Sequence, residues 1–94
     1  MLLLPSMLTE NEARDTLRML KQAMDREGGE QLVVVDAAPL TRFDSSALAV
    51  LLECQRQARA TGRKLVLRNT PIRLTELARL YGVDALVLQA EAIA

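Results

Sequence analysis

The sequence has no histidine and no tryptophan, and its only aromatic residues are Phe43 and Tyr81. Without histidine, neither Ser-His-Asp nor Cys-His activation of a nucleophile can be assembled, and the usual zinc ligand sets are excluded. Two aromatic side chains give no platform for stacking nucleic-acid bases, and a net charge of zero gives no attraction to phosphate backbones. The composition therefore argues against a triad enzyme and against a nucleic-acid partner.

Cysteine and long apolar runs are equally scarce. Cys54 is the only cysteine and falls within a helical pattern, so we expect a packed thiol rather than a reactive one. One cysteine allows no disulfide framework, which suits a reducing, cytoplasmic compartment. The apolar runs are far shorter than the ~20 residues of a spanning helix, so no direct membrane insertion is expected. If the protein works at a membrane, another protein must hold it there.

Apolar runs alternate with helical periodicity, which predicts one α/β domain over residues 1–94. Strands are expected at residues 2–4, 32–35, 65–67 and 86–88, helices at 10–26, 45–60 and 71–81, and the start of another helix at 91–94. This order implies parallel strands joined by right-handed crossovers. The predicted fold is a small, mostly parallel central sheet with helices packed on it.

Local signals refine these elements. Thr9 and Glu12 have capping-box spacing ahead of the first helix, and Thr70 is expected to cap the third helix with Pro71 at its first position. The apolar side of that third helix is predicted to comprise Ile72, Leu74, Leu77, Ala78 and Tyr81. The run at 32–35 is β-branched and does not alternate, so this strand should be buried on both faces. The arginines are scattered over several elements, and we interpret them as solvated surface.

The most informative stretch is residues 42–52, Arg-Phe-Asp-Ser-Ser-Ala-Leu-Ala-Val-Leu-Leu. Asp44 can cap a helix start, and a hydroxyl beside it sits where free N–H groups and a partial positive charge would receive a phosphate. Ser45 is therefore a possible phosphorylation site, whereas the alternative role for Ser45 and Ser46 is helix capping. A metal site made by Asp36 and Asp44 is disfavoured, because two carboxylates are few ligands for a hard cation. No catalytic residue, metal or cofactor is predicted.

The helix after Asp44 has two different sides when it is projected at ~100° per residue. The side expected to lie on the sheet comprises Ala47, Leu48, Val50, Leu51, Cys54, Gln55 and Ala58. The outer side offers small residues and an exposed, apolar Leu52 in its first two turns, where a solvated helix would show Lys and Glu. This pattern favours contact with a partner, although alanine is also simply a good helix former. The predicted partner-binding residues are Ser45, Ser46, Ala49, Leu52, Glu53 and Arg56.

These motifs together resemble the STAS domain, the fold of anti-sigma-factor antagonists and of the C-terminal domains of sulfate transporters. The resemblance rests on the strand that ends in Asp36, the Asp44-Ser45-Ser46 turn, the helix through 48–52 and the Gly62-Arg63-Lys64 turn. It covers nearly the whole chain. Such domains usually start with one more strand, which is short or missing here.

Two subtypes share this pattern. Anti-sigma-factor antagonists carry Asp-Ser-Ser-Gly-Leu-Gly, in which a partner kinase phosphorylates the first Ser; Ser45 aligns with it, and Ala47 and Ala49 replace the glycines. The run at 48–52, the stretch at 75–83 and the minimal length look more like the MlaB-type subunit of the Mla ABC transporter. That transporter moves phospholipid between the membranes of Gram-negative bacteria.

The MlaB-type resemblance implies a non-enzymatic cytoplasmic accessory subunit. It would bind the ATPase subunit (MlaF-like) of a phospholipid-transport ABC complex that also has permease and lipid-binding subunits. It would support assembly and activity of that complex, and so maintain the lipid asymmetry of the outer membrane, while lying peripheral to the inner membrane. The alternative is an anti-sigma-factor antagonist that is switched by phosphorylation of Ser45.

Overall fold

A parallel three-stranded sheet lies at the centre of the molecule. A second sheet, made of two strands of two residues each, lies at one end. The computed structural model describes residues 2–26 and 31–87. In chain order the elements are β1 (Leu2–Leu3), β2 (Met7–Leu8), α1 (Glu10–Arg26), β3 (Leu32–Asp36), β4 (Arg42–Phe43), α2 (Ser46–Ala60), β5 (Lys64–Arg68), α3 (Ile72–Leu80) and α4 (Asp84–Val87). The predicted α/β class with a mostly parallel sheet is confirmed.

The main sheet has the strand order β1-β3-β5, and all of its pairs are parallel. Val33 and Val35 of β3 stand opposite Leu65 and Leu67 of β5, and all four side chains are buried. β1 adds only two residues at the other edge, with Leu2 opposite Val35. The first strand is therefore short. The sequence did not predict β2 and β4, which pair with each other and bring the loop before α2 against the chain segment before α1.

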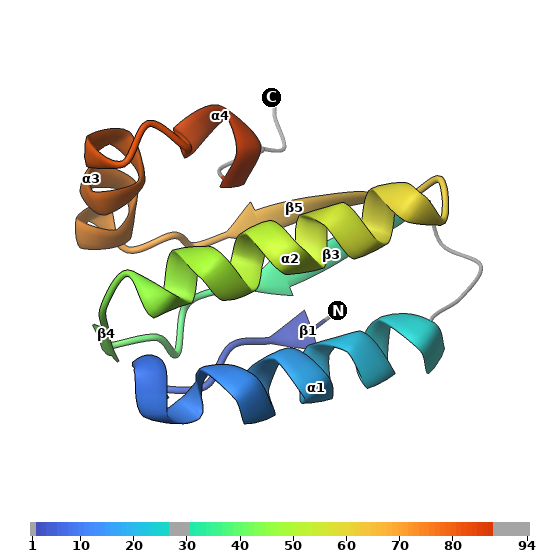
Figure 1. Cartoon of the computed structure of the whole chain (residues 1–94), viewed down its shortest axis with the longest axis horizontal. Helices are drawn as coiled ribbons and strands as arrows, with labels where there is room; N and C mark the ends of the chain where they lie inside the picture. The colour runs from blue at the N-terminus through green and yellow to red at the C-terminus, as the bar shows by residue number, and fades with distance from the viewer. Residues whose placement is uncertain (1, 27–30, 88–94) are drawn as a thin grey trace.

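Helices α1 and α2 run side by side over one face of this sheet, and both run in the same direction (Figure 1). The capping-box prediction for α1 is confirmed, because the Thr9 N–H donates to Glu12 Oε1 over 2.8 Å. The predicted inner side of α2 is also confirmed, because the buried residues of that helix are Ala47, Leu48, Val50, Leu51, Cys54, Gln55 and Ala58. A period of 3.6 residues thus fixes which side of α2 forms the core.

Burial of the central strands differs from the prediction in one respect. β5 is buried on both faces, but Leu32 of β3 is 53% exposed and Val34 is half-buried. The prediction for residues 32–35 is therefore wrong, because α1 and α2 lie over one face of β3 only (Figure 1). An apolar run without alternation did not distinguish a strand covered on one face from a strand covered on both.

The start and the outer side of α3 also depart from the prediction. Pro71, not Thr70, occupies the capping position, and no side chain caps this helix. Leu74 and Ala78 are buried as expected, but Ile72 is 76% exposed. Pro71 itself, with its ring-fixed φ of −60° and an extended ψ of 142°, sets the start of the helix here without a hydroxyl cap.

The end of the described chain is helical rather than extended. Residues 84–87 form α4, so the strand predicted at 86–88 is wrong as far as the structure describes it. Gly82 adopts a positive φ of 71° after α3, and this turn leads through Val83 into the new helix. The expected helix at 91–94 lies outside the described residues.

Two buried polar side chains, Gln55 and Arg63, form hydrogen bonds between elements. The Gln55 side-chain amide donates to the carbonyl oxygens of Leu65 in β5 and Leu86 in α4, each over 3.2 Å. Arg63 is buried, and its guanidinium donates to the Met24 carbonyl oxygen of α1. The interpretation of every arginine as solvated surface is therefore wrong for Arg63.

Candidate partner-binding site

The loop before α2 is held by one carboxylate. Asp44 Oδ1 accepts the Ser46 N–H over 2.8 Å, and Asp44 Oδ2 accepts the Glu10 N–H at the start of α1 over 3.4 Å. The bond from the Ser46 N–H, and to a lesser degree the Ser46 hydroxyl, holds the pKa of Asp44 below its ordinary value. Asp44 therefore stays ionised and satisfies one free N–H group at each of two helix starts.

Ser45 precedes the first residue of α2 and uses its side chain differently from Asp44. Its backbone is already helical, with φ −63° and ψ −16°, and its hydroxyl makes no capping hydrogen bond. The residue is exposed, whereas the following Ser46 is half-buried. The Ser45 hydroxyl is thus presented to the surroundings at the rim of the domain.

The outer side of α2 continues from Ser45 with a small residue and then an ion pair. Ala49 is exposed, as expected. Leu52 was expected to be exposed, but it is half-buried and packs against the core. Glu53 accepts hydrogen bonds from Arg56 Nε over 3.0 Å and from Gln57 Nε2 over 3.1 Å. The Arg56 bond, followed by the Gln57 bond, lowers the pKa of Glu53 to about 2.

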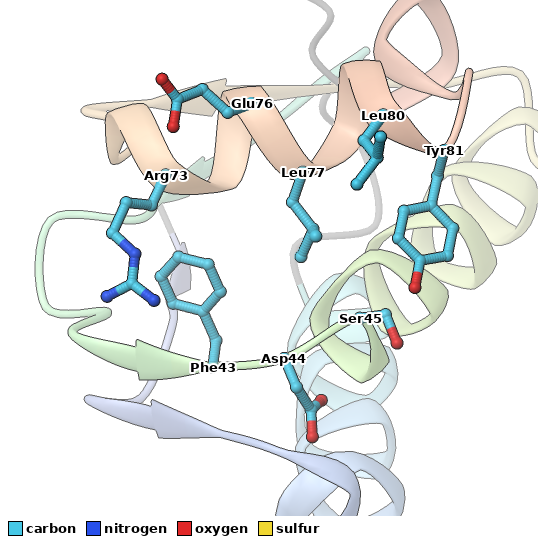
Figure 2. Close-up of a pocket in the computed structure, with 8 residues that line it drawn as sticks. All are labelled: Phe43, Asp44, Ser45, Arg73, Glu76, Leu77, Leu80 and Tyr81. Atoms are coloured by element: carbon cyan, nitrogen blue, oxygen red, sulfur yellow. The ribbon is translucent and has the colours of Figure 1, made fainter.

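A hollow of about 460 Å³ opens beside Ser45, between the loop and α3. Figure 2 shows Leu77 pointing into it from α3, with the Tyr81 ring extending toward Ser45 at the start of α2. The lining residues are Phe43, Asp44, Ser45, Arg73, Glu76, Leu77, Leu80 and Tyr81. Two of the sequence-predicted site residues, Asp44 and Ser45, thus meet an α3 surface that the sequence analysis did not include.

The α3 side of the hollow is apolar where Leu77, Leu80 and Tyr81 line it, and charged where Arg73 and Glu76 line it. Leu80 is 80% exposed and Tyr81 is 58% exposed, so both are available for contact. Arg73 fixes the other end of the hollow, because its guanidinium carbon lies 5.8 Å from the centroid of the Phe43 ring, a distance at which a cation and an aromatic face attract. Helical periodicity excludes only Leu80 from the core side of α3, because Tyr81 follows Leu74 and Ala78 at i, i+4, i+7 spacing. The prediction that Tyr81 belongs to the apolar side of α3 with Leu74 and Ala78 is wrong, because Tyr81 follows the last residue of α3 and is exposed.

The two remaining candidate groups serve the fold. Asp36 Oδ1 accepts the Ala38 N–H over 2.9 Å and Asn69 Nδ2 over 3.1 Å, so its carboxylate organises the loops after β3 and β5. Within residues 2–26 and 31–87, no three His, Cys, Asp or Glu side chains are placed to hold a metal ion.

Cys54 is 1% exposed, and burial raises the pKa of its thiol to about 12. Across the described residues, no helix has the length and apolar character needed to cross a bilayer.

A short parallel sheet with two helices on one face, and an Asp-Ser loop that leads into the second of them, is the architecture of a STAS domain. Residues 3–89 match the family model described as "Mlab, STAS domain". The chain therefore belongs to the MlaB-type STAS domain family, which confirms the resemblance seen in the sequence. A comparison with curated proteins gave no match.

Proposed function

We propose that this protein is a non-enzymatic accessory subunit that binds the ATPase of an Mla-type phospholipid-transport ABC complex. In that role it supports assembly and activity of the complex and so helps to maintain outer-membrane lipid asymmetry. The observation that carries the proposal is the position of Ser45 at the rim of the hollow in which Leu80 and Tyr81 are exposed. Membership of the MlaB-type family supports the choice of an ABC transporter as the partner.

The proposed contact surface consists of the outer side of α2 and the apolar side of the hollow. Ser45 and Ala49 are exposed and small, so a partner backbone can come close to α2. Leu80 and Tyr81 supply exposed apolar area beside Ser45. Contiguous exposed apolar side chains are typical of protein contact sites, and Tyr is a common energetic centre of such contacts.

The test is binding of the purified protein to the ATPase subunit of the transporter from the same organism. Ser45→Arg and Ala49→Arg place long charged side chains on the proposed surface, and we expect each to weaken binding at least tenfold. The matched control is Ala60→Arg, an equal change at an exposed position in the last turn of the same helix. The control should bind like wild type, and all three variants should melt within a few degrees of wild type.

The α3 side of the surface has its own matched pair. Leu80→Asp should weaken binding, because it places a charge in the apolar part of the contact. Ile72→Asp is the control, since Ile72 is just as exposed on α3 but does not line the hollow. If wild type does not bind the ATPase, or if Ser45→Arg and Leu80→Asp both bind like wild type, the proposed function or its surface is wrong.

A second candidate function is an anti-sigma-factor antagonist that is controlled by phosphorylation of Ser45. The observation in its favour is that the Ser45 hydroxyl is exposed and makes no capping hydrogen bond, so a kinase can reach it without unfolding α2. Phosphate would suit the positive end of the helix but would block a close-fitting partner. Intact-mass measurement of protein from its native cells would show a phosphorylated fraction if this function applies.

A further inference from the structure

A groove with an apolar floor begins between α1 and α2 and continues along α1, away from the hollow beside Ser45. Its first part has a volume of about 270 Å³ and is lined by Ala13, Arg14, Leu17, Ala49 and Val50. Its second part, of about 240 Å³, is lined by Arg14, Leu17, Arg18 and Lys21. The two parts share Arg14 and Leu17, so they form one continuous depression, which we call the α1–α2 groove.

One wall of the α1–α2 groove is basic. Arg14, Arg18 and Lys21 are spaced four and three residues apart, so they project from the same side of α1 over about 10 Å. Within the part of the chain that the structure describes, Arg14 makes no ion pair and no side-chain hydrogen bond. The Arg18 guanidinium lies 3.8 Å from Asp15, and both side chains are largely exposed, which makes the pair weak.

The facing wall on α2 does not neutralise this charge. Its carboxylate, Glu53, is held by hydrogen bonds from Arg56 and Gln57 of its own helix. Lys21 lies near enough to lower the pKa of Glu53, but Arg56 dominates that shift. The carboxylates on the same side of α1 as the basic wall, Glu10 and Asp25, lie beyond its two ends. The middle of the groove therefore keeps a surplus of positive charge.

The floor of the groove suits a helix. Ala13 is half-buried and Ala49 is exposed, so two small side chains lie where a third backbone would pass, and the half-buried Leu17 beside them adds apolar area. Small residues allow helices to approach at the short end of the 8–10 Å range of interaxial distances. An amphipathic helix laid in an apolar groove is a recurrent mode of peptide recognition.

We propose that the α1–α2 groove binds an acidic amphipathic helix of the ATPase partner. The apolar side of that helix rests on Leu17 and Ala49, and its Asp or Glu side chains face Arg14, Arg18 and Lys21. The inference rests on the proposed function, and Ala49 belongs to both surfaces, so one partner can cover them together. A second copy of the chain is a poor occupant, because none of its described helices carries carboxylates at matching four- and three-residue spacing.

The test compares ATPase binding by wild type and by the double variant Arg14→Glu with Arg18→Glu, at low and high salt. We expect the double variant to bind at least tenfold more weakly at low salt, and to lose most of the salt dependence that wild type shows. The control is Arg26→Glu with Arg59→Glu, which makes the same change in net charge at exposed positions outside the groove. This control should bind within about twofold of wild type.

A photo-cross-linking amino acid at position 18 identifies the occupant directly. Mass spectrometry of the adduct with the ATPase should find a helical segment with Asp or Glu at matching spacing. If wild type does not bind the ATPase, the proposed function fails and this inference fails with it. If Ser45→Arg abolishes binding while the groove variant binds like wild type, or if the adduct lies in a neutral or basic segment, only the groove inference fails.

A lipid surface is the competing source of negative charge. Wild type should not sediment with vesicles of phosphatidylcholine that contain about one third phosphatidylglycerol. Sedimentation that the groove variant abolishes, together with ATPase binding that the variant leaves unchanged, would assign the basic wall to an anionic membrane and overturn the helix proposal.

Discussion

The Arg63 guanidinium donates a hydrogen bond of 2.8 Å to the carbonyl oxygen of Met24, across the junction between β5 and the last turn of α1. Its Nε also donates to Thr61 Oγ1 over 2.9 Å. The carbonyl groups in the last turn of a helix have no partner within the helix, so Arg63 caps the C-terminus of α1 from another element. The Gly62-Arg63-Lys64 turn thus has a structural role, with Gly62 at a φ of 74° in the turn from α2 into β5.

Replacing Arg63 with Met should destabilise the fold. The change keeps much of the buried stem but removes two charge-assisted hydrogen bonds, and we expect a loss of about 1.5–3 kcal/mol in the free energy of unfolding. The measurement is urea denaturation, with the exposed Arg59→Met as the control, which should stay within about 0.5 kcal/mol of wild type. Equal midpoints for the two variants would show that the Arg63 contact is not needed.

Replacing Gln55 with Leu should loosen α4. Gln55 Oε1 accepts the buried Leu65 N–H over 3.2 Å, and the amide nitrogen donates to Leu86, so the substitution leaves a strand N–H without its partner. The expected loss is about 1–3 kcal/mol in the free energy of unfolding. Relative to wild type, hydrogen exchange should speed up more in residues 84–87 than in α1. Gln22→Leu at an exposed position of α1 is the control. Unchanged exchange in α4 would contradict the proposed bridge.

The Cys54 thiol should be inert in the native protein. It is 1% exposed, and burial raises its pKa to about 12, so the reactive thiolate is scarce at neutral pH. An aromatic disulfide reagent should label the native protein only at the rate at which the fold opens and exposes the thiol. It should label the protein fully in denaturant. A surface cysteine introduced by Ala60→Cys should react within seconds. Equally fast labelling of native wild type would place Cys54 outside the core.

The ion pair on the outer side of α2 should make stability depend on acid pH. Glu53 has a pKa of about 2 in the folded protein and an ordinary value of 4.5, so the native state favours its carboxylate. Its contribution is therefore complete above about pH 4.5 and is lost as the pH falls toward 2. Urea midpoints between pH 6 and pH 3 should fall less steeply for Glu53→Gln than for wild type. Arg56→Met removes the main cause of the shift and should flatten the slope in the same way.

The sequence predicted what depends on short-range periodicity. The buried side of α2 followed from a period of 3.6, and the start of α1 followed from the spacing of Thr9 and Glu12. It failed where packing between elements decides the outcome: residues 84–87 are helical because they dock on α2 and α3, although Leu86 and Val87 have strand propensity.

Half of the candidate site was predictable for the same reason. Asp44, Ser45 and Ala49 belong to one continuous motif, and their relative positions follow from the helix start. Leu80 and Tyr81 reach Ser45 only through the placement of α3, which no local pattern specifies. The sequence analysis also missed the basic wall of α1, because whether its positive charge is neutralised depends on the α2 residues that face it.

The bonds of Asp44 to the starts of both α1 and α2 have a consequence for selectivity. The two helices run in the same direction, so their partial positive ends converge at this carboxylate (Figure 1). The Asp44 carboxylate therefore offsets the partial positive charge of both helix starts, and these starts themselves give an approaching protein little long-range attraction. Discrimination at Ser45 must then come from shape at short range, whereas charge guides the approach along α1.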